Sequence, residues 1–242
     1  MELIWDSLPR MMTGALLTIE LTALSVALGL CLAVPLAMLY LAKNPVLSLP
    51  VRTYVFYFRG TPLLVQIFLI YYGSGQFRDA LEEVGLWTFF REPYFCAVLS
   101  LTLNTAAYTA YILRGAITNV SFGEVEAARA CGMSRALLYR RIILPSAFRL
   151  ALPSYTNEVV FLFQATSLVS IISLLDLTGV ARIIVARSFE VYDIYITAAV
   201  LYLIGTYAML WGFRKLEHWW SGHLRVREDN ALAIATEGIQ VR

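Results

Sequence analysis

The chain has 242 residues, of which 59% are hydrophobic and only 15% charged, and its mean hydropathy is +0.67. Soluble domains carry about a quarter charged residues, so this composition excludes an ordinary soluble protein and indicates an integral membrane protein. The net charge of +2 provides no basic excess for nucleic acid and no acidic excess for intrinsic disorder. The three cysteines are dispersed, which argues against a disulfide framework and a structural zinc site.

Five apolar runs are long enough to cross a bilayer, which takes roughly 20 helical residues. The runs are residues 11–41, 51–73, 94–113, 147–175 and 192–213. Pro35 and Pro62 fall inside two of them and are tolerated in membrane spans, because neighbouring groups satisfy the freed carbonyls. We therefore predict an all-α membrane fold with five transmembrane helices, one domain over residues 1–220, and a polar, poorly ordered tail over residues 221–242.

The distribution of basic residues predicts the orientation of these spans. Fourteen of the 19 Lys and Arg residues fall in one set of loops and ends, and the other five fall in the opposite set beside most of the loop carboxylates. Short cytosolic loops are enriched in Lys and Arg. We expect the N-terminus outside and the C-terminus in the cytosol. The apolar start of the chain is not expected to be a cleaved signal peptide, because Glu2 and Asp6 precede Arg10.

The connections between spans contain two segments that are more than simple loops. Residues 74–93 form a mixed polar and aromatic external segment with an expected helical turn at 79–84. Residues 114–150 are too long for a simple loop and too charged for a span. Helix formers over 124–141 predict two short helices that break at Gly132. Periodicity alone leaves open a surface helix whose basic face lies on anionic lipid.

The cytosolic segment contains the pattern E-A-A-x3-G-x9-I-x-L-P, which resembles the coupling motif of permease subunits of ATP-binding cassette (ABC) importers. Its members here are Glu126, Ala127, Ala128, Gly132, Ile142, Leu144 and Pro145. In that family the corresponding segment, here residues 124–145, docks on the ATP-binding subunit as a helix-turn-helix. The small side chains of the pattern permit the backbones of the two subunits to approach closely, and the charged side chains beside them fix the position of the segment on its partner.

Further stretches are similar to permeases for polar amino acids. They are RGTPLLVQ at 59–66, LNTAAYTAYILRG at 103–115, and Leu152-Pro153 through Asn157-Glu158. The likeness runs from about Thr13 to His218 and implies the type I ABC importer permease fold with a cytosolic coupling helix. It is strongest to subunits for histidine, lysine/arginine/ornithine and opines. One departure is Tyr111, where many relatives carry an acidic residue.

The same resemblance implies the partners and the location of the chain. The implied partners are two copies of an ATP-binding subunit, a second permease chain that is related or identical, an external amino-acid-binding protein, and membrane lipid. The implied location is the bacterial inner membrane. The chain itself is expected to need no metal or other cofactor, because ATP is bound by the partner subunit.

Polar side chains within the predicted spans cost free energy in a bilayer, so each of them is expected to have a structural or functional role. Glu158 lies about eleven residues into the fourth span, near the midplane. It is the main candidate for recognising a cationic amino-acid group, and a packing role is the alternative. The further candidates for substrate contact are Asn104, Gln164, Asn157, Tyr108 and Gln66. Arg59, Thr61 and Pro62 are expected to be structural or to belong to an intracellular gate.

Glu20, in the first span, is expected to pair with a structural partner or another subunit.

Other classes of protein fit less well. The chain has no G-x-x-x-x-G-K-[ST] sequence for binding phosphates and no His in the spans for catalysis or metal, so an enzyme is not expected. A secondary carrier would show inverted repeats and a coupling-ion site. A non-conducting partner or scaffold subunit remains the closer alternative.

Overall fold

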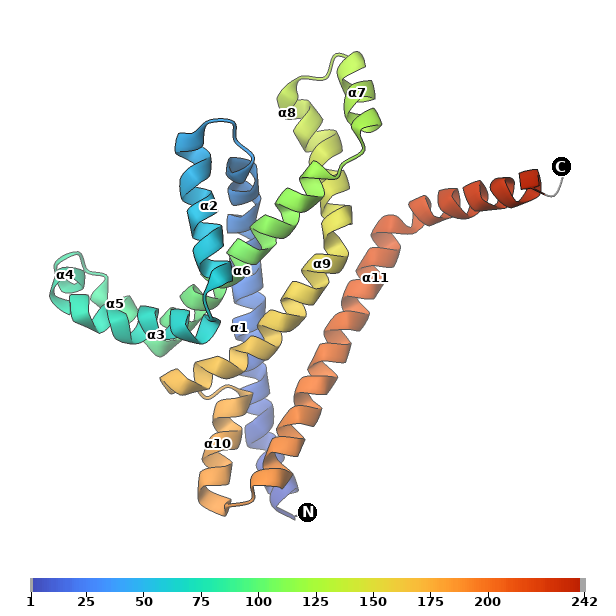
Figure 1. The fold of residues 1–242 in the computed structure, drawn as a ribbon. Coiled ribbons are helices and arrows are strands. Elements are labelled where there is room, and N and C mark those ends of the chain that lie inside the picture. Colours follow the sequence, from blue (N-terminus) through green and yellow to red (C-terminus); the bar gives the residue numbers. More distant parts are fainter. Residues whose placement is uncertain (1, 240–242) are drawn as a thin grey trace.

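The computed structural model describes the backbone of residues 2–239 and the side chains of residues 3–220. Within this part the regular elements are all helical, as the composition predicted. The α-helices are α1 (Glu2–Tyr40), α2 (Pro45–Gly60), α3 (Leu63–Ser74), α4 (Arg78–Glu83), α5 (Trp87–Phe90), α6 (Pro93–Thr118), α7 (Phe122–Ala130), α8 (Arg135–Leu138), α9 (Leu144–Ala165), α10 (Leu177–Ser188) and α11 (Val191–Ile239). Helices α7 and α8 lie at the end of the molecule opposite the N-terminus and α10 (Figure 1).

Four of the five expected spans are single long helices. Helices α1, α6, α9 with its flanking turns, and α11 are long and apolar enough to cross a membrane. Helix α1 begins at Glu2, well before the predicted start of its apolar run. The fourth span does not remain α-helical to residue 175, because it changes at Thr166–Ile172 into a 3-10 helix that ends at Ser173 in the left-handed conformation.

The second expected span differs from the prediction. It is divided into α2 and α3, which meet at an angle of 106° around Thr61 and Pro62. The N-terminal half, α2, runs beside α1, and α3 with α4 and α5 projects sideways from the bundle (Figure 1). Proline restricts the preceding residue to extended backbone, and Thr61 has φ −115° and ψ 147°. Pro62 therefore breaks the helix where the sequence had predicted a tolerated proline in a continuous span.

The helices pack around α6, which is the most buried span. Helix α1 runs along α6, and α2, α3 and α9 cover other sides of it. Gly29 permits a close approach of α1 and α6, because a Cβ atom there would collide with the Thr105 methyl group. A separate cluster at the N-terminal end joins α1, α10 and α11 through Met11, Leu177 and Ile194.

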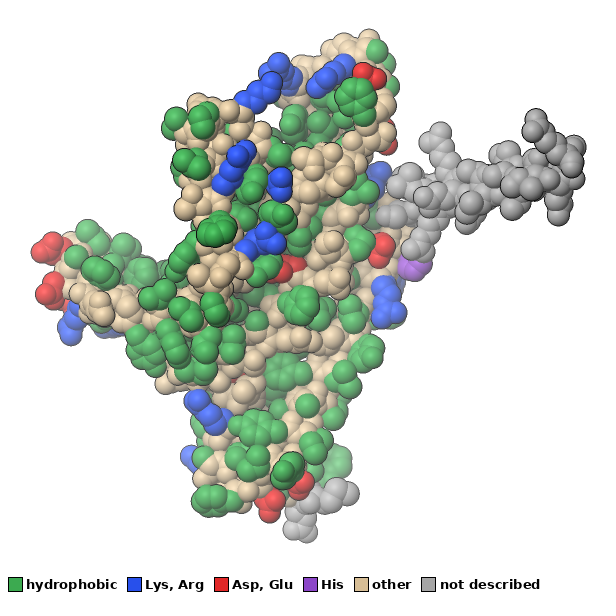
Figure 2. All heavy atoms as spheres, viewed as in Figure 1, with side chains coloured by type: hydrophobic (Ala, Val, Ile, Leu, Met, Phe, Trp, Pro, Cys, Tyr) green, Lys and Arg blue, Asp and Glu red, His purple; other side chains and the backbone are tan. Residues whose placement is uncertain are grey.

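The outer surface is strongly apolar, as a lipid-facing surface requires. Large exposed side chains occur along α1 and α11, including Leu16, Leu28, Leu203 and Trp211. Figure 2 shows apolar side chains over much of the visible face, with Lys and Arg gathered toward the end that carries α2, α7 and α8.

The backbone of α11 continues as a helix to Ile239, beyond the predicted end of the fifth span. The stretch Ala231-Leu232-Ala233-Ile234-Ala235 consists largely of good helix formers, which explains a local helical preference. Residues 240–242 lie outside the described part of the chain.

Candidate functional site

The break between α2 and α3 creates the centre of the site. A helix that stops inside an apolar region leaves backbone carbonyls without partners, and these must be satisfied by side chains. The Gln66 amide nitrogen donates to the Phe58 carbonyl at 2.8 Å, the Thr61 carbonyl at 3.0 Å and the Thr61 hydroxyl at 2.9 Å. Gln66 is 1% exposed and so closes the bend from inside.

Helix α6 holds the bend from the other side. The Asn104 amide nitrogen donates to Gln66 Oε1 at 2.9 Å and approaches the Phe58 carbonyl at 3.3 Å. The Tyr108 hydroxyl donates to the Arg59 carbonyl at 3.3 Å. Two side chains on one face of α6 thus fix the end of α2, and the same face continues into a cavity.

This cavity has a volume of about 430 Å³ and lies between α3, α6 and α9. Its lining combines one carboxylate, one amide and two hydroxyls with apolar side chains. The lining residues are Thr61, Pro62, Leu63, Asn104, Tyr108, Glu158, Phe161, Leu162 and Ala165. Ligand sites are usually concave and mostly apolar with a few convergent polar groups, which describes this cavity.

Glu158 supplies the only charged side chain of the cavity wall. It is 9% exposed and has no Lys or Arg nitrogen within 4.0 Å among the described side chains. A buried carboxylate facing a cavity is suited to bind a cation that enters it.

The structure brings together only some of the predicted site residues. Asn104, Tyr108 and Glu158 line the cavity with Thr61 and Pro62, whereas Gln66 lies behind its wall. Asn157 and Gln164 do not line it and instead form an exposed stripe of α9 with Ser154, next to Phe161 at the cavity edge. Among the described side chains, this stripe of α9 is left uncovered.

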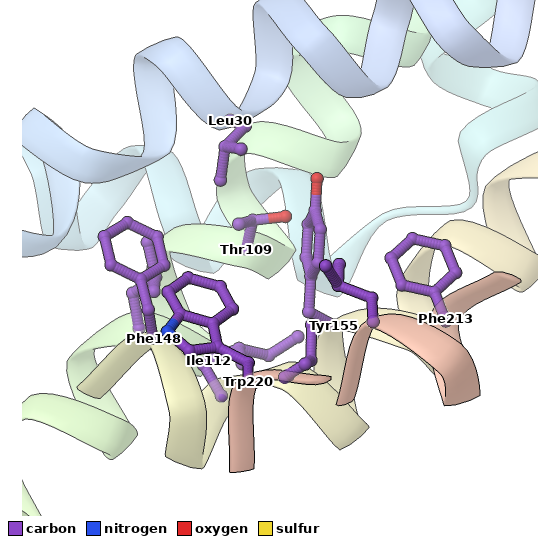
Figure 3. A pocket seen from close by; sticks show the side chains of 11 residues that line it. Leu30, Thr109, Ile112, Phe148, Tyr155, Phe213 and Trp220 are labelled. Carbon is purple, nitrogen blue, oxygen red and sulfur yellow. The ribbon is translucent and has the colours of Figure 1, made fainter. Parts of the chain in front are cut away.

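A second cavity lies elsewhere in the bundle and has a different character. It has a volume of about 240 Å³ between α1, α6, α9 and α11. Figure 3 shows Tyr155 of α9 standing in this cavity, with Phe213 and Trp220 of α11 at its side. Its lining contains no charged side chain, so it lacks a group that could bind a zwitterion.

The predicted docking segment forms a helical hairpin. Helix α7 ends at Ala130, and Gly132 has φ +74°, a left-handed conformation that glycine adopts without a Cβ penalty. Helix α8 then starts at Arg135 and is capped by Ser134, whose hydroxyl accepts a hydrogen bond from the Leu137 nitrogen at 3.4 Å. A π-helical turn over Tyr139–Ile143 joins α8 to α9. The break at Gly132 lies where the sequence predicted it.

Residues of the E-A-A pattern divide between the core and the surface of this hairpin. Ala128 is buried in a small cluster with Leu138 and Ile143, and half-buried Ile142 of the pattern packs against it, so that these residues hold the two arms together. Glu126, Ala127 and Gly132 are exposed on the outside. Phe122 and Leu137 are also exposed, at 70% and 42%, which leaves apolar surface at the tip of the molecule.

Comparison with known proteins identifies the family. Residues 25–221 match the family described as the binding-protein-dependent transport system inner membrane component. The chain belongs to this family. It is therefore a transport permease, and the ABC importer resemblance of its sequence is confirmed.

Individual relatives cover nearly the whole permease. It is 45% identical to the nopaline transport system permease protein of Agrobacterium fabrum over 98% of both chains. It is 42% identical to the histidine/lysine/arginine/ornithine transport system permease protein of Escherichia coli strain K12, covering 88% of this chain and 90% of that one. A solved amino acid ABC transporter with histidines matches 89% of this permease and 96% of that chain, with a TM-score of 0.77 and 30% identity.

Sequence reasoning missed part of the cavity wall. Leu63 and Leu162 line the cavity but carry no polar group that would single them out in an apolar run. The sequence indicates them only by spacing, since Leu63 follows Pro62 and Leu162 lies one helical turn after Glu158. This spacing places them in the cavity wall only once the bend between α2 and α3 is known.

Proposed function

We propose that this permease carries polar amino acids, of the basic or opine type, through the cavity between α3, α6 and α9, with Glu158 binding a cationic group of the substrate. The single observation that carries the proposal is a nearly buried carboxylate in the wall of a cavity of about 430 Å³. The names of the relatives, which concern nopaline, octopine and basic amino acids, support the same substrate classes.

The other cavity residues have complementary roles in this proposal. Asn104 and Tyr108 contact the substrate or position the wall, and Thr61 with Pro62 forms the corner between α2 and α3. Gln66 acts indirectly, because its amide group is hydrogen-bonded to the Phe58 carbonyl and to Asn104 at the bend between α2 and α3. Asn157 and Gln164 face a second permease chain, related or identical, because their stripe of α9 is uncovered within this chain.

The energy for transport comes from outside this chain. The hairpin of residues 124–145 docks on an ATP-binding subunit, of which the complex contains two, and exposed Glu126, Ala127 and Gly132 form part of the contact. An external binding protein delivers the substrate. Closure of the ATP-binding subunits moves the hairpin and, through the π-helical turn, α9, so that the cavity alternates between the two sides of the bacterial inner membrane. The hairpin end is cytosolic, in agreement with its arginines.

Uptake of radiolabelled arginine by the assembled complex in proteoliposomes tests the role of Glu158. We expect Glu158→Ala to reduce uptake by at least tenfold while the permease still copurifies with the ATP-binding subunit. The reason is that the cation then enters an apolar cavity without a counter-charge.

The matched control is Glu20→Ala, which removes a carboxylate from the middle of α1. Glu20 Oε1 accepts a hydrogen bond from the Tyr94 hydroxyl at 2.6 Å and lies outside the cavity. Uptake should persist in this variant. Normal uptake by Glu158→Ala would instead support a scaffold role for this subunit.

A further inference from the structure

The second cavity lies beside the least buried of the long spans. Helix α11 packs mainly on α9 and α10, and less of it is buried than of α1, α6 or α9. The apolar cavity of about 240 Å³ lies between α11 and α6. Figure 3 shows aromatic side chains around this space, those of Phe148, Tyr155, Phe213 and Trp220. The cavity is therefore part of the bundle, and one of its walls is a loosely packed helix.

This cavity extends from an exposed rim to a buried floor. Leu216 of α11, at the rim, is 39% exposed, whereas Thr109 and Leu113 of α6 are 1% and 4% exposed. Phe148 lies one helical turn after the start of α9, so the cavity belongs to the half of the bundle next to the α7–α8 hairpin. Because the rim lies on the outer side of a membrane span, the cavity opens toward lipid and closes at α6.

The cavity suits a hydrocarbon better than water. The hydroxyl oxygens of Thr109 and Tyr155 are enclosed by other atoms, so the surface that the cavity presents is apolar. A buried water needs two to four polar partners, and an apolar cavity of about 150 Å³ stays dry and binds benzene. An empty cavity leaves the atoms of its wall without dispersion contacts. The hydrocarbon that surrounds a membrane span is the acyl chain of a phospholipid.

Positive charge lies next to the apolar rim. Arg214 and Lys215 of α11 are exposed and take no part in the ion pairs of the described side chains. The Nε atom of Arg149 in α9 is buried and has no hydrogen-bond partner within the described part of the chain. Glu217 is the one carboxylate of residues 213–220, so basic groups are in excess. Basic side chains at the end of a span attract anionic lipid headgroups.

We propose that the second cavity binds an anionic phospholipid, with one acyl chain between α6 and α11 and the headgroup at Arg214 and Lys215. The bound chain fills the space that the helices leave and completes the packing of α11 on the bundle. This inference rests on the membrane location of the chain and does not depend on which solute the permease carries.

Photo-crosslinking of the purified complex of permease and ATP-binding subunits tests this site. The probes are phosphatidylglycerol and phosphatidylcholine, each with a diazirine in the middle of one acyl chain. Surrounding lipid reacts with the outer faces of the spans, whereas adducts on Thr109 or Leu113 report the cavity, because these residues are buried. We expect such adducts from phosphatidylglycerol and several-fold fewer from phosphatidylcholine. No adducts on these residues, or equal amounts from both probes, would overturn the proposal.

Variants that fill the cavity identify where the acyl chain binds. Leu216→Trp fills the rim without changing a buried residue and should reduce the adducts on α6 at least tenfold. Ala151→Phe fills the cavity from α9 and should do the same. Leu150→Phe adds the same ring at a 54% exposed position of α9 outside the cavity, and is the matched control. Unchanged adducts in both filled variants would refute the cavity as the site.

Two further variants test the headgroup contact. Arg214→Gln and Lys215→Gln should each reduce the preference for phosphatidylglycerol about fivefold, which corresponds to the usual contribution of one basic residue to anionic lipid binding. Lys43→Gln, in the loop between α1 and α2, is the matched control and should leave the preference unchanged. A preference that persists in both Arg214→Gln and Lys215→Gln would refute the assignment of the headgroup.

Discussion

Asp176 is fully buried where α1, α10 and α11 meet, and its carboxylate caps the start of α10. Oδ1 accepts a hydrogen bond from the Gly179 nitrogen at 3.0 Å, and Oδ2 accepts from the Thr178 nitrogen at 3.2 Å. The Tyr202 hydroxyl of α11 approaches Oδ2 at 3.3 Å. One side chain thus ties the connection after the fourth span to the last span.

Replacing Asp176 should lower stability by an amount set by the lost cap. We expect Asp176→Ala to reduce the free energy of unfolding by about 1 kcal/mol or more, because capping side chains contribute about that much and buried donors lose their acceptor. Asp176→Asn keeps an acceptor oxygen and should be milder. Apparent melting temperatures of the purified complex in detergent measure this order, and equal losses in both variants would contradict it.

The pH dependence at Asp176 has a definite sign. Burial raises the pKa of Asp176 to about 6, although the hydrogen bonds from Gly179, Thr178 and Tyr202 lower it. The unfolded chain has a pKa near 4 at this residue, so the folded state binds a proton more readily between about pH 4 and 6. The contribution of Asp176 to stability is therefore largest below pH 4 and falls as the pH rises through 6. Asp176→Asn should remove this slope, which melting temperatures across the window check directly.

Among the elements, the α7–α8 hairpin turns at Gly132, whose backbone conformation favours glycine and whose surroundings are open. Gly132 has a positive φ, and a Cβ atom there would meet nothing within 4 Å in the chain itself. A side chain at this position would project into open space, although the positive φ strains any residue that has a Cβ atom. A loss of coupling greater than this strain produces elsewhere would come from a surface that approaches from outside.

Gly132→Asp is expected to abolish substrate-stimulated ATPase activity of the complex while the permease remains in the membrane. An added carboxylate blocks close backbone approach of the ATP-binding subunit and puts a buried charge in the contact. ATP hydrolysis with and without loaded binding protein measures the effect.

The control for this variant is Gly85→Asp, in the connection between α4 and α5. Gly85 has φ +73° and equally open surroundings, so it reproduces the backbone strain without the contact. Stimulated hydrolysis should survive in Gly85→Asp. Its survival in Gly132→Asp as well would show that the docking assignment is wrong.

For the whole molecule, the native cysteines provide a test of orientation. Cys131 is exposed beside Gly132 in the hairpin, Cys96 is buried in α6, and Cys31 lies within the apolar span α1. A charged, membrane-impermeant maleimide should label Cys131 in inside-out vesicles and not in spheroplasts. Coexpression of the ATP-binding subunit should reduce the labelling.

Cys131→Ser identifies the labelled site in that experiment, since its signal should disappear. Labelling of Cys131 from the outside of intact spheroplasts would reverse the orientation and remove the proposed cytosolic contact. The outcome does not depend on which amino acid is transported.

The sequence by itself determined the membrane location, four of the spans, the break at Gly132 and the family. These properties depend on local composition, on hydropathy over about 20 residues, and on residue spacing within one segment. Glu158 could be chosen as a candidate binding residue for the same reason. A carboxylate within an apolar run is recognisable from the sequence alone, however the helix packs.

Only the tertiary structure decided how the second span bends and which polar groups meet. Pro62 is compatible with a kinked continuous helix, and the 106° angle is held by Gln66 and Asn104, which lie 38 residues apart. The contacts of Arg59 with the Tyr111 ring and of Arg114 with the Tyr40 ring likewise join the ends and faces of α1, α2 and α6. Such contacts depend on the relative position and rotation of packed helices, and hydropathy along one segment contains no information about either.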